Sequence, residues 1–372
     1  MHLLLIGIPI YAFWAGSARK TGHEESWAMK AAVLRQGHVV VDEFADPRPS
    51  FGQVLVDVKA CGICGSDLHF VKHGEEMLRL AGEMRGLPEF GDARTDLGRD
   101  VFMGHEFAAE VVEAGPDTES PPAGTLVTSL PVMVTMSGVE TLVYSNDFPC
   151  GYSQRMLLSA PLLQVVPNGL DAKRAALTEP MAVGLHAVNR SHIAQGEGAL
   201  VLGCGPIGIA VIAALKLRGI EPIVAADFST VRRELALTVG AHESVDPAEE
   251  PSWDAWQRTG GGRQLVVFEA VGVPGMINEI LRAAPLNSRV VVVGVCMGSD
   301  SVVPFWAISK EIDIRFVLGY NPQEFNDSLL AIAEGRIDVG PIISGEVPVD
   351  GVPGAFAELA EPDRHCKILV VP

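Results

Sequence analysis

Two patterns of apolar and polar positions divide the chain near residue 171. From Met29 to about residue 170 the apolar runs are short and often alternate with polar residues, as in QVLVDVKA (53–60) and FAAEVVEAG (107–115). Turn residues separate these runs, and this combination is typical of antiparallel strands. The first part of the chain is therefore predicted to form a β-rich domain.

The second pattern begins at Asp171, which can cap a helix through DAKRAALTEPMAVGLHAV. Apolar runs then alternate with helical stretches up to about residue 320. The strand-like runs are ALVLG (199–203), PIVAAD (222–227), LVVFEA (265–270), RVVVVG (289–294) and IDIRFVLG (312–319). This alternation predicts an α/β domain with a parallel sheet covered on both faces. Short alternating segments return in the tail, which suggests that the second domain is inserted into the first.

Two segments fit neither pattern. Residues 1–28 start with MHLLLIGIPIYAFWAG, and the first positive charges follow this apolar stretch, the reverse of a secretory signal. The stretch is short for a bilayer span, so we interpret 1–28 as an extension outside the fold, with a membrane-associating segment as the alternative. Residues 70–104 mix charges and glycines over a length typical of a lid or binding loop, or of a solvated excursion.

Composition narrows the class of protein. A chain of 372 residues suits two domains, and 48% apolar with 20% charged residues describes a packed globular protein. A net charge of −18 would repel phosphate backbones, which argues against nucleic-acid binding. Six cysteines are too few for a disulfide scaffold and indicate a reducing compartment, so we expect a cytoplasmic protein.

A glycine-rich loop follows the first strand-like run of the second domain. It carries the G-x-G-x-x-G pattern in Gly203, Gly205 and Gly208, with Pro206 and Ile207 inside it. The pattern alone is weak, but here it lies between a strand and a helix that ends at Gly219, as dinucleotide binding requires. The glycines permit a tight turn and close approach of the backbone to a pyrophosphate, which the helix N-terminus attracts.

An acidic residue stands where a dinucleotide site needs one. Asp227 comes 19 residues after Gly208, at the end of the second predicted strand. A carboxylate there accepts hydrogen bonds from both ribose hydroxyls and repels a 2′-phosphate, which favours NAD over NADP. Arg232 and Arg233 follow and leave room for NADP. A helix N-cap is the structural alternative for Asp227.

The candidate metal ligands are scattered. Cys61 and Cys64 form a C-x-x-C pair in KACGICGSDLH (59–69), which could be a redox dithiol, half of a structural zinc site, or one catalytic ligand beside an unrelated cysteine. A structural site needs a second close pair, which is missing, and a thioredoxin-like dithiol belongs near a βαβ unit. A catalytic site needs three ligands and an open position. Further candidates are His105 and Glu106 in GHE, and Glu179 in an apolar stretch.

These motifs are more specific together. CGICGSDLH, GHE, EPMAVGLHAV and the glycine loop, in this order, resemble the zinc-dependent medium-chain dehydrogenases, the alcohol and sorbitol dehydrogenase family. The resemblance extends from Met29 to Pro372. It implies a GroES-like catalytic domain over 29–180 and 321–372, an inserted Rossmann doubly wound domain over 181–320, and an active site between them.

The resemblance also implies roles for single residues. The zinc ligands it implies are Cys64, His105 and Glu179, with Glu106 as a neighbouring carboxylate that can approach or replace a ligand. Ser66 and His69 match a proton relay, and Arg232 matches a basic residue near the adenosine ribose. Many relatives carry a lobe with four cysteines that bind a second zinc. Only Cys150 stands in that region here, so we predict one catalytic zinc and no structural zinc.

The implied activity is hydride transfer between an alcohol and NAD, giving an aldehyde or ketone. A polyol or sugar-alcohol dehydrogenase of the same family is the first alternative, and a dinucleotide-binding protein without catalysis is the second. Phe70, Met181 and Val295 lie near the motifs and suggest an apolar substrate pocket. A homodimer or homotetramer built through the nucleotide-binding domains is implied, with no nucleic-acid or membrane partner.

Overall fold

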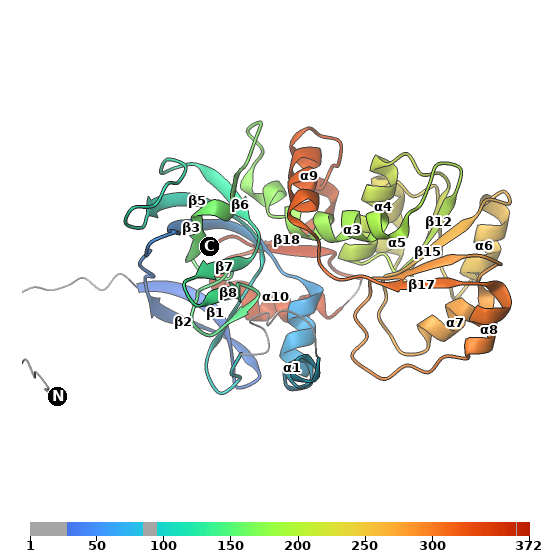
Figure 1. Cartoon of the computed structure of the whole chain (residues 1–372), viewed down its shortest axis with the longest axis horizontal. Helices are drawn as coiled ribbons and strands as arrows, with labels where there is room; N and C mark the ends of the chain where they lie inside the picture. The colour runs from blue at the N-terminus through green and yellow to red at the C-terminus, as the bar shows by residue number, and fades with distance from the viewer. Residues whose placement is uncertain (1–27, 85–94, 362) are drawn as a thin grey trace, which may run out of the picture.

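The computed structural model describes residues 28–84, 95–361 and 363–372, and within them the chain forms two lobes (Figure 1). The first lobe is built from strands of the first part of the chain and from its last segment. The second is a parallel sheet flanked by helices. The extension predicted over 1–28 lies outside the described residues except for Ala28, where the first strand begins.

The β-rich lobe is organised around one long strand, β3 (Gln53–Gly62). It pairs antiparallel with β5 (Glu106–Ala114), β10 (Arg155–Ser159) and β19 (Lys367–Val370). The sheet order is β11-β6-β5-β3-β19-β18. The remaining strands of the lobe are β1 (Ala28–Arg35), β2 (His38–Ala45), β4 (Val101–Met103), β6 (Leu126–Ser129), β7 (Val132–Thr135), β8 (Gly138–Thr141), β9 (Tyr144–Ser145), β11 (Leu163–Val165) and β18 (Ile343–Val347). The β-rich domain predicted from the alternating runs is confirmed.

The second lobe has six parallel strands in the order β14-β13-β12-β15-β16-β17. They are β12 (Gly198–Leu202), β13 (Ile223–Ala226), β14 (Glu243–Val245), β15 (Leu265–Glu269), β16 (Arg289–Val292) and β17 (Asp313–Phe316). Five match the predicted runs, and β14 was missed because it is short and half polar. The strand order reverses between β12 and β15, where such sheets bind dinucleotides.

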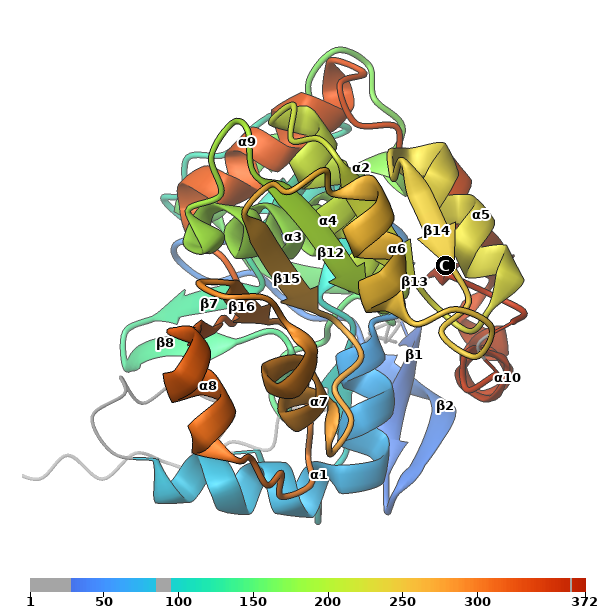
Figure 2. The same cartoon turned by 90° about the vertical axis from the view of Figure 1, so that its right-hand side faces the viewer.

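Helices cover both faces of this sheet because its strands are apolar on both (Figure 2). On β12, Ala199 and Val201 belong to the core that includes helices α3 (Thr178–Ser191) and α4 (Pro206–Leu217). Leu200 and Leu202 point to the opposite core. That core includes α6 (Ser252–Thr259) and α7 (Met276–Ala283), and the other helices of this lobe are α5 (Thr230–Val239) and α8 (Pro304–Lys310).

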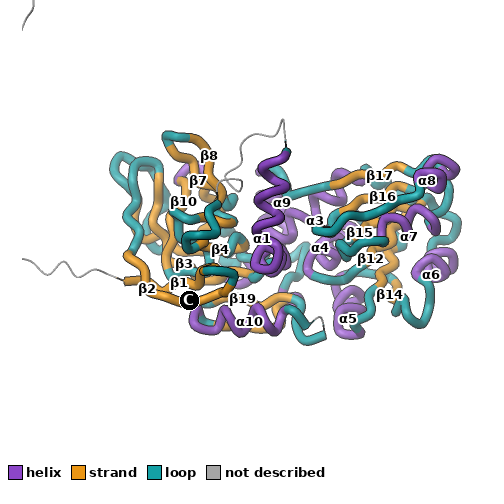
Figure 3. The backbone as a smooth tube through the Cα atoms, turned by 90° about the horizontal axis from the view of Figure 1, so that it is seen from below, coloured by secondary structure: helices purple, strands orange, loops and turns teal. Residues whose placement is uncertain are grey.

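The chain then returns to the first lobe, as the insertion hypothesis requires. Helix α9 (Pro322–Ala333) leads to β18 and α10 (Val352–Leu359), labelled in Figure 1, and then to β19, labelled in Figure 3. β19 pairs with the end of β3 through Leu369↔Gly62 and Val370↔Cys61. The predicted β-rich domain with an inserted doubly wound domain is therefore confirmed. Short 3₁₀ turns cover Ala160–Leu162, Gly340–Ile342 and Val349–Gly351.

Two predictions about helices need correction. The segment 70–104 is not one long loop, because helix α1 (Gly65–Glu83) occupies its first part, with a kink at His73. The residue at its N-cap is a cysteine and not the usual Ser, Thr, Asp or Asn, and few of its positions are apolar. The sequence therefore does not mark where this helix begins. The helix predicted after Asp171 is two helices, α2 (Ala172–Ala175) and α3, although Asp171 does cap α2 by accepting from the Arg174 N–H at 3.0 Å.

No helix within the described segments combines the length and the apolar character that a membrane crossing requires.

Candidate metal centre and nucleotide site

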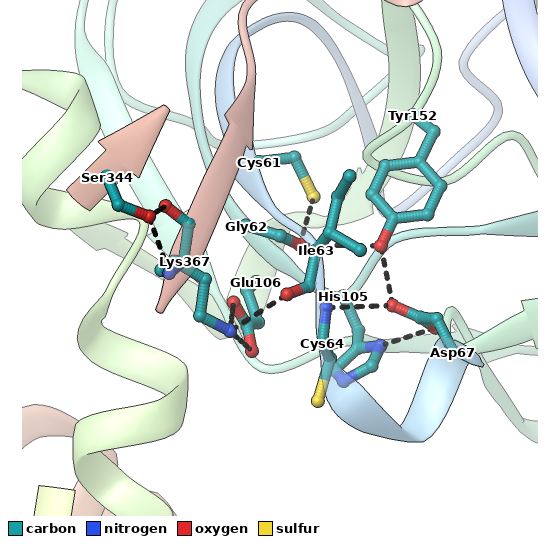
Figure 4. Close-up of polar contacts among 10 residues, drawn as sticks. All are labelled: Cys61, Gly62, Ile63, Cys64, Asp67, His105, Glu106, Tyr152, Ser344 and Lys367. Carbon is teal, nitrogen blue, oxygen red and sulfur yellow. Dashed lines mark hydrogen bonds and ion pairs between the residues drawn. The ribbon is translucent and has the colours of Figure 1, made fainter. Parts of the chain in front are cut away.

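Cys64 lies where β3 ends and α1 begins (Figure 4). It is the N-cap residue of α1, and its backbone N–H donates to Asp67 Oδ2 at 3.2 Å. A carboxylate in the first helical turn that bonds back to the cap residue fixes the angle at which the helix starts. The partly exposed Cys64 thiol is therefore held at the N-terminus of a helix.

Three side chains converge at this point. Ligand atoms of Cys64, His105 and Glu106 all lie within 4.8 Å of one another, and no second such group occurs in the described segments. His105 and Glu106 stand at the start of β5, whose register pairs Glu106 with Gly62 of β3. Gly62 has to lack a side chain, since a Cβ there would lie 2.0 Å from Glu106 Oε2.

Glu106 is fully buried, and a buried lysine neutralises it. Lys367 Nζ donates to Glu106 Oε1 at 2.7 Å and Oε2 at 2.8 Å, and to the Ile63 carbonyl at 3.0 Å. All three ammonium donors are thus used, which a buried charge requires. Glu106 and Ile63 come from the first lobe's early segments and Lys367 from β19, so the returning chain completes the centre.

A second buried carboxylate, that of Asp67, faces His105. Its Nδ1 lies 3.6 Å from Asp67 Oδ1, which leaves Nε2 as the nitrogen available to a metal. Burial alone would lower the pKa of His105, but the charges of Asp67 and Cys64 outweigh it and raise that pKa. Tyr152 Oη donates to Asp67 Oδ2 at 2.5 Å, and burial raises the pKa of its phenol, which keeps its proton.

Glu179 lies in the first turn of α3, at the boundary between the lobes, and is buried. Burial raises the pKa of Glu179 to about 7, against the opposing effect of His105. It is not one of the three side chains in the 4.8 Å group, and the Tyr320 hydroxyl donates a hydrogen bond to it. The structure therefore places Glu179 beside the cluster, in contact with the second lobe.

Cys61 takes no part in the cluster, although it belongs to the same motif. It is completely buried, and its thiol donates to the Gly62 carbonyl at 3.6 Å. Burial raises the pKa of the Cys61 thiol well above its usual value. The described contacts of Cys61 are those of a packing residue.

The two residues assigned to a proton relay are one turn apart on α1. Ser66 and His69 are spaced i and i+3, so they share a face of the helix. His69 Nδ1 is buried and has no hydrogen-bond partner within the described residues. Burial lowers the pKa of His69 below its usual 6.5, as do the charges of His73 and Lys72.

The glycine loop has the geometry that its pattern predicts. Gly203 adopts φ +87°, and a Cβ at Gly208 would lie 1.8 Å from the Gly203 carbonyl oxygen. Gly205 is the N-cap of α4 and Pro206 its first residue. The first turn of α4, which contains Ile207 and Gly208, has backbone N–H groups without acceptors inside the helix, and such a helix start favours a phosphate.

Asp227 follows β13, and each of its carboxylate oxygens accepts one backbone bond. Cys204 N–H donates to Oδ2 at 2.7 Å and Ser229 N–H to Oδ1 at 2.8 Å. Ser229, not Asp227, caps α5. Arg233 is committed to the backbone carbonyls of Asp227 and Phe228 and to Asp246, while Arg232 has a buried Nε without a partner among the described residues.

Four residues at the site were missed in the sequence: Asp67, Tyr152, Tyr320 and Lys367. Lys367 did leave a signal, because a lone lysine in the apolar run HCKILVVP must find a buried partner. Asp67 stands inside the CGICGSDLH motif, but no pattern in the sequence marks it as a partner of His105. No pattern in the sequence marks Tyr152 or Tyr320 as a residue of the site.

A cysteine, a histidine and a glutamate whose ligand atoms lie within 4.8 Å of one another are a donor set that suits zinc, so the residues present fit this ion. Together with a doubly wound sheet and a dinucleotide-type glycine loop, this candidate site is typical of oxidoreductases that use a nucleotide cofactor and a metal.

Comparison with known proteins identifies the family. Residues 50–161 match the alcohol dehydrogenase GroES-like domain, and residues 206–334 match the zinc-binding dehydrogenase domain. The chain belongs to the zinc-dependent medium-chain dehydrogenase family, which confirms the resemblance drawn from the motifs.

Relatives with assigned activities cover nearly the whole chain. (R,R)-butanediol dehydrogenase of Bacillus subtilis is 31% identical, over 92% of this chain and 100% of the relative. Sorbitol dehydrogenase of B. subtilis is 25% identical, over 92% and 97%. The crystal structure of the B. subtilis butanediol dehydrogenase superposes with a TM-score of 0.78 over 92% and 99% of the chains, at 29% identity. The protein is accordingly an oxidoreductase of the zinc-type alcohol and polyol class.

Proposed function

We propose that the protein oxidises an alcohol to a carbonyl compound, or reduces the carbonyl, with NAD as hydride carrier and one catalytic zinc. Cys64 and His105 would hold the ion with Glu179, and Glu106 would be the neighbouring carboxylate. The convergence of Cys64, His105 and Glu106 within 4.8 Å carries this proposal. The bonds from Lys367 to both Glu106 oxygens support the assignment of Glu179 as the third ligand.

A zinc ion bound here would supply the Lewis acidity that lowers the pKa of an alcohol. The protein's own groups then have three tasks. Asp67 would keep His105 oriented, and Lys367 would hold both carboxylate oxygens of Glu106 in place beside the ligands. Ser66 and His69 would carry the released proton toward solvent, since a neutral imidazole can accept it.

The preference for NAD over NADP rests on Asp227. An ionised carboxylate is only an acceptor, and each of its two oxygens can accept more than the single backbone bond described above. It would accept from the ribose hydroxyls and repel a 2′-phosphate. The positive charge of Arg232, which lies close to the glycine loop, would instead attract a 2′-phosphate and favour NADP. One structural neighbour from Sinorhizobium meliloti, 26% identical with a TM-score of 0.78, is bound to NADP.

We infer a homodimer or homotetramer joined through the nucleotide-binding lobes. β17 forms one edge of the six-stranded sheet, and edge strands pair readily with another chain. Phe316 and Leu318, at and after its end, are 65% and 88% exposed, and Phe305 and Ile308 of α8 are 70% and 74% exposed. Apolar side chains of this size at a sheet edge support a second copy as the partner.

A polyol or sugar-alcohol dehydrogenase is the second candidate function. A glutamate at position 179 and the similarity to butanediol and sorbitol dehydrogenases favour it. A dinucleotide-binding protein without catalysis is the remaining alternative, and the assembled ligand cluster argues against it. The cytoplasm stays the predicted location, in keeping with six free cysteines.

One experiment tests these proposals together. Metal content is measured first, and then reduction of NAD and NADP with a panel of simple alcohols, vicinal diols and sugar alcohols, with and without a chelator. We expect about one zinc per chain, chelator-sensitive turnover and a higher kcat/KM with NAD. Turnover that survives complete removal of metal would refute the zinc assignment, and a higher kcat/KM with NADP would refute the role of Asp227.

A further inference from the structure

Two buried polar atoms face each other beside the ligand cluster without a hydrogen bond. His105 Nδ1 and Asp67 Oδ1 lie 3.6 Å apart, and neither has a hydrogen-bond partner within the described residues. The separation is a few tenths of an ångström longer than a hydrogen bond. A small movement of either group would therefore decide whether the imidazole is oriented.

The position of the Asp67 carboxylate is set through its other oxygen. Oδ2 accepts from Tyr152 Oη at 2.5 Å and from the Cys64 N–H at 3.2 Å. Bonds from hydroxyl to carboxylate are the short and strong kind, so the phenol dominates this pair. Tyr152 is itself 0% exposed, and its ring packs edge-on against Phe356 at 6.0 Å between centroids.

The backbone around Tyr152 is held as tightly as its ring. Its N–H donates to the Met103 carbonyl at 3.1 Å, two residues before His105, and its carbonyl accepts from the Ala32 N–H at 3.0 Å. A Cβ at Gly104 would lie 2.7 Å from the Tyr152 ring, so the ring touches the segment that carries the histidine. The phenol therefore has one fixed place from which to reach Asp67.

We propose that Tyr152 is a positioning residue of the metal centre, whose hydroxyl holds Asp67 so that this carboxylate orients His105 as a ligand. The inference rests on the proposed zinc site and extends it to a residue that contacts no ligand. Loss of an outer partner of a ligating histidine typically weakens metal affinity about 10- to 100-fold. Tyr152 contacts Asp67 and not the histidine itself, so for the loss of its hydroxyl we expect metal affinity to fall by the lower end of that range, about 10-fold.

The test measures the Zn²⁺ affinity of four proteins: wild type, Tyr152→Phe, Asp67→Asn and the double variant. Each protein competes with a chromophoric chelator for Zn²⁺, and the absorbance of the chelator reports how much of the metal the protein binds. Tyr152→Phe removes only the hydroxyl. We expect about tenfold weaker Zn²⁺ binding for Tyr152→Phe, a larger loss for Asp67→Asn, and no further loss in the double variant. Two groups that act through one shared bond are not additive, whereas independent packing defects would add.

One further measurement and one control variant separate positioning from packing. With Co²⁺ as the probe, the visible absorption bands of Tyr152→Phe should differ from those of wild type, because the ligand field responds to the orientation of His105. Ser129→Ala is the matched control. It removes a buried hydroxyl of the same lobe that donates only to the carbonyls of Leu130 and Leu162, and it should keep wild-type affinity.

The outcomes are distinct. If Tyr152→Phe binds Zn²⁺ within twofold of wild type, or the double variant loses as much as the two single losses combined, the inference is overturned while the zinc site stands. If wild type itself binds no zinc, the proposed function fails, and the inference fails with it. Should Tyr152→Phe not fold, Phe356→Leu takes its place, because it removes the ring that packs edge-on against Tyr152 and changes no hydrogen-bonding group. Zn²⁺ binding weaker than wild type by more than threefold supports the role of Tyr152, and wild-type affinity refutes it.

Discussion

The metal centre and the nucleotide loop are built in opposite ways. The loop from Gly203 to Gly208, with Asp227 and Ser229, is local: a strand, a turn and a helix contiguous in sequence hold every group in place. The metal centre collects groups from β3, β5 and β19, and one of its bonds joins residues 261 positions apart. A local site depends on backbone conformation, whereas a dispersed site depends on buried polar partners.

This difference predicts which changes damage each site. Cys64→Ala or His105→Ala should abolish bound zinc and turnover together, a loss larger than the roughly 100-fold that follows removal of an outer partner. Metal analysis and steady-state kinetics measure both effects. Cys61→Ala is the control within the same motif and should retain the metal, since Cys61 is packed away from the cluster. Full activity without Cys64 would refute the assignment.

Lys367→Met should destabilise the whole β-rich lobe, because it leaves the buried Glu106 carboxyl group without its ion-pair partner. Breaking such a pair costs about 3–5 kcal/mol, measured as the free energy of unfolding in urea. Adding Glu106→Gln should restore part of that loss. Lys59→Met is the control, because its pair with Glu110 is partly exposed and contributes at most about 1 kcal/mol. Equal losses in the two lysine variants would contradict this account.

Gly208→Ala should damage the local site alone. Its methyl group would lie 1.8 Å from the Gly203 carbonyl oxygen, and overpacking of this kind costs about 1–3 kcal/mol. NAD should then bind about 5- to 150-fold more weakly by fluorescence titration, with the zinc content unchanged. In Gly354→Ala, an added methyl meets nothing within 4 Å, and NAD affinity should be that of wild type. Zinc loss in Gly208→Ala would show that the two sites are coupled.

His69→Gln should have the smallest effect, an alcohol oxidation rate lowered about tenfold, less than the 10²-fold or more of a direct general base. Because burial lowers the pKa of His69 below 6.5, the wild-type imidazole stays neutral and accepting to a lower pH than a free histidine. The deficit should therefore be greatest on the acidic side of the pH–rate profile. His38→Gln, an exposed histidine of β2, is the control. An unchanged profile would argue against the relay.

The lowered pKa of His69 also affects the free energy of unfolding. As the pH falls below about 6.5, the unfolded chain takes up the His69 proton before the folded protein does. The folded state therefore loses stability as the pH falls through that range, and His69→Gln should remove this contribution.

The contrast also explains what the sequence could predict. The glycine loop, Asp227 and five strands of the parallel sheet were predictable because strand, turn and helix follow one another along the chain. Cys64, His105 and Glu179 were recognisable only as members of a family pattern. Tyr152 and Lys367 could not be placed, since their partners lie in other segments: Asp67 is 85 positions from Tyr152. Helix α1 was missed because a cysteine occupies its cap.

The strand β19 has a consequence for how the protein is made. Glu106 leaves the ribosome long before Lys367, and the complete nucleotide-binding lobe is synthesised in between. At about 5–20 residues per second, 261 positions take roughly 13–50 s. Throughout that interval the carboxylate has no ammonium partner and the edge of β3 has no β19. We therefore expect the inserted lobe to fold first, and the β-rich lobe to close around the candidate metal centre only when β19 has been made.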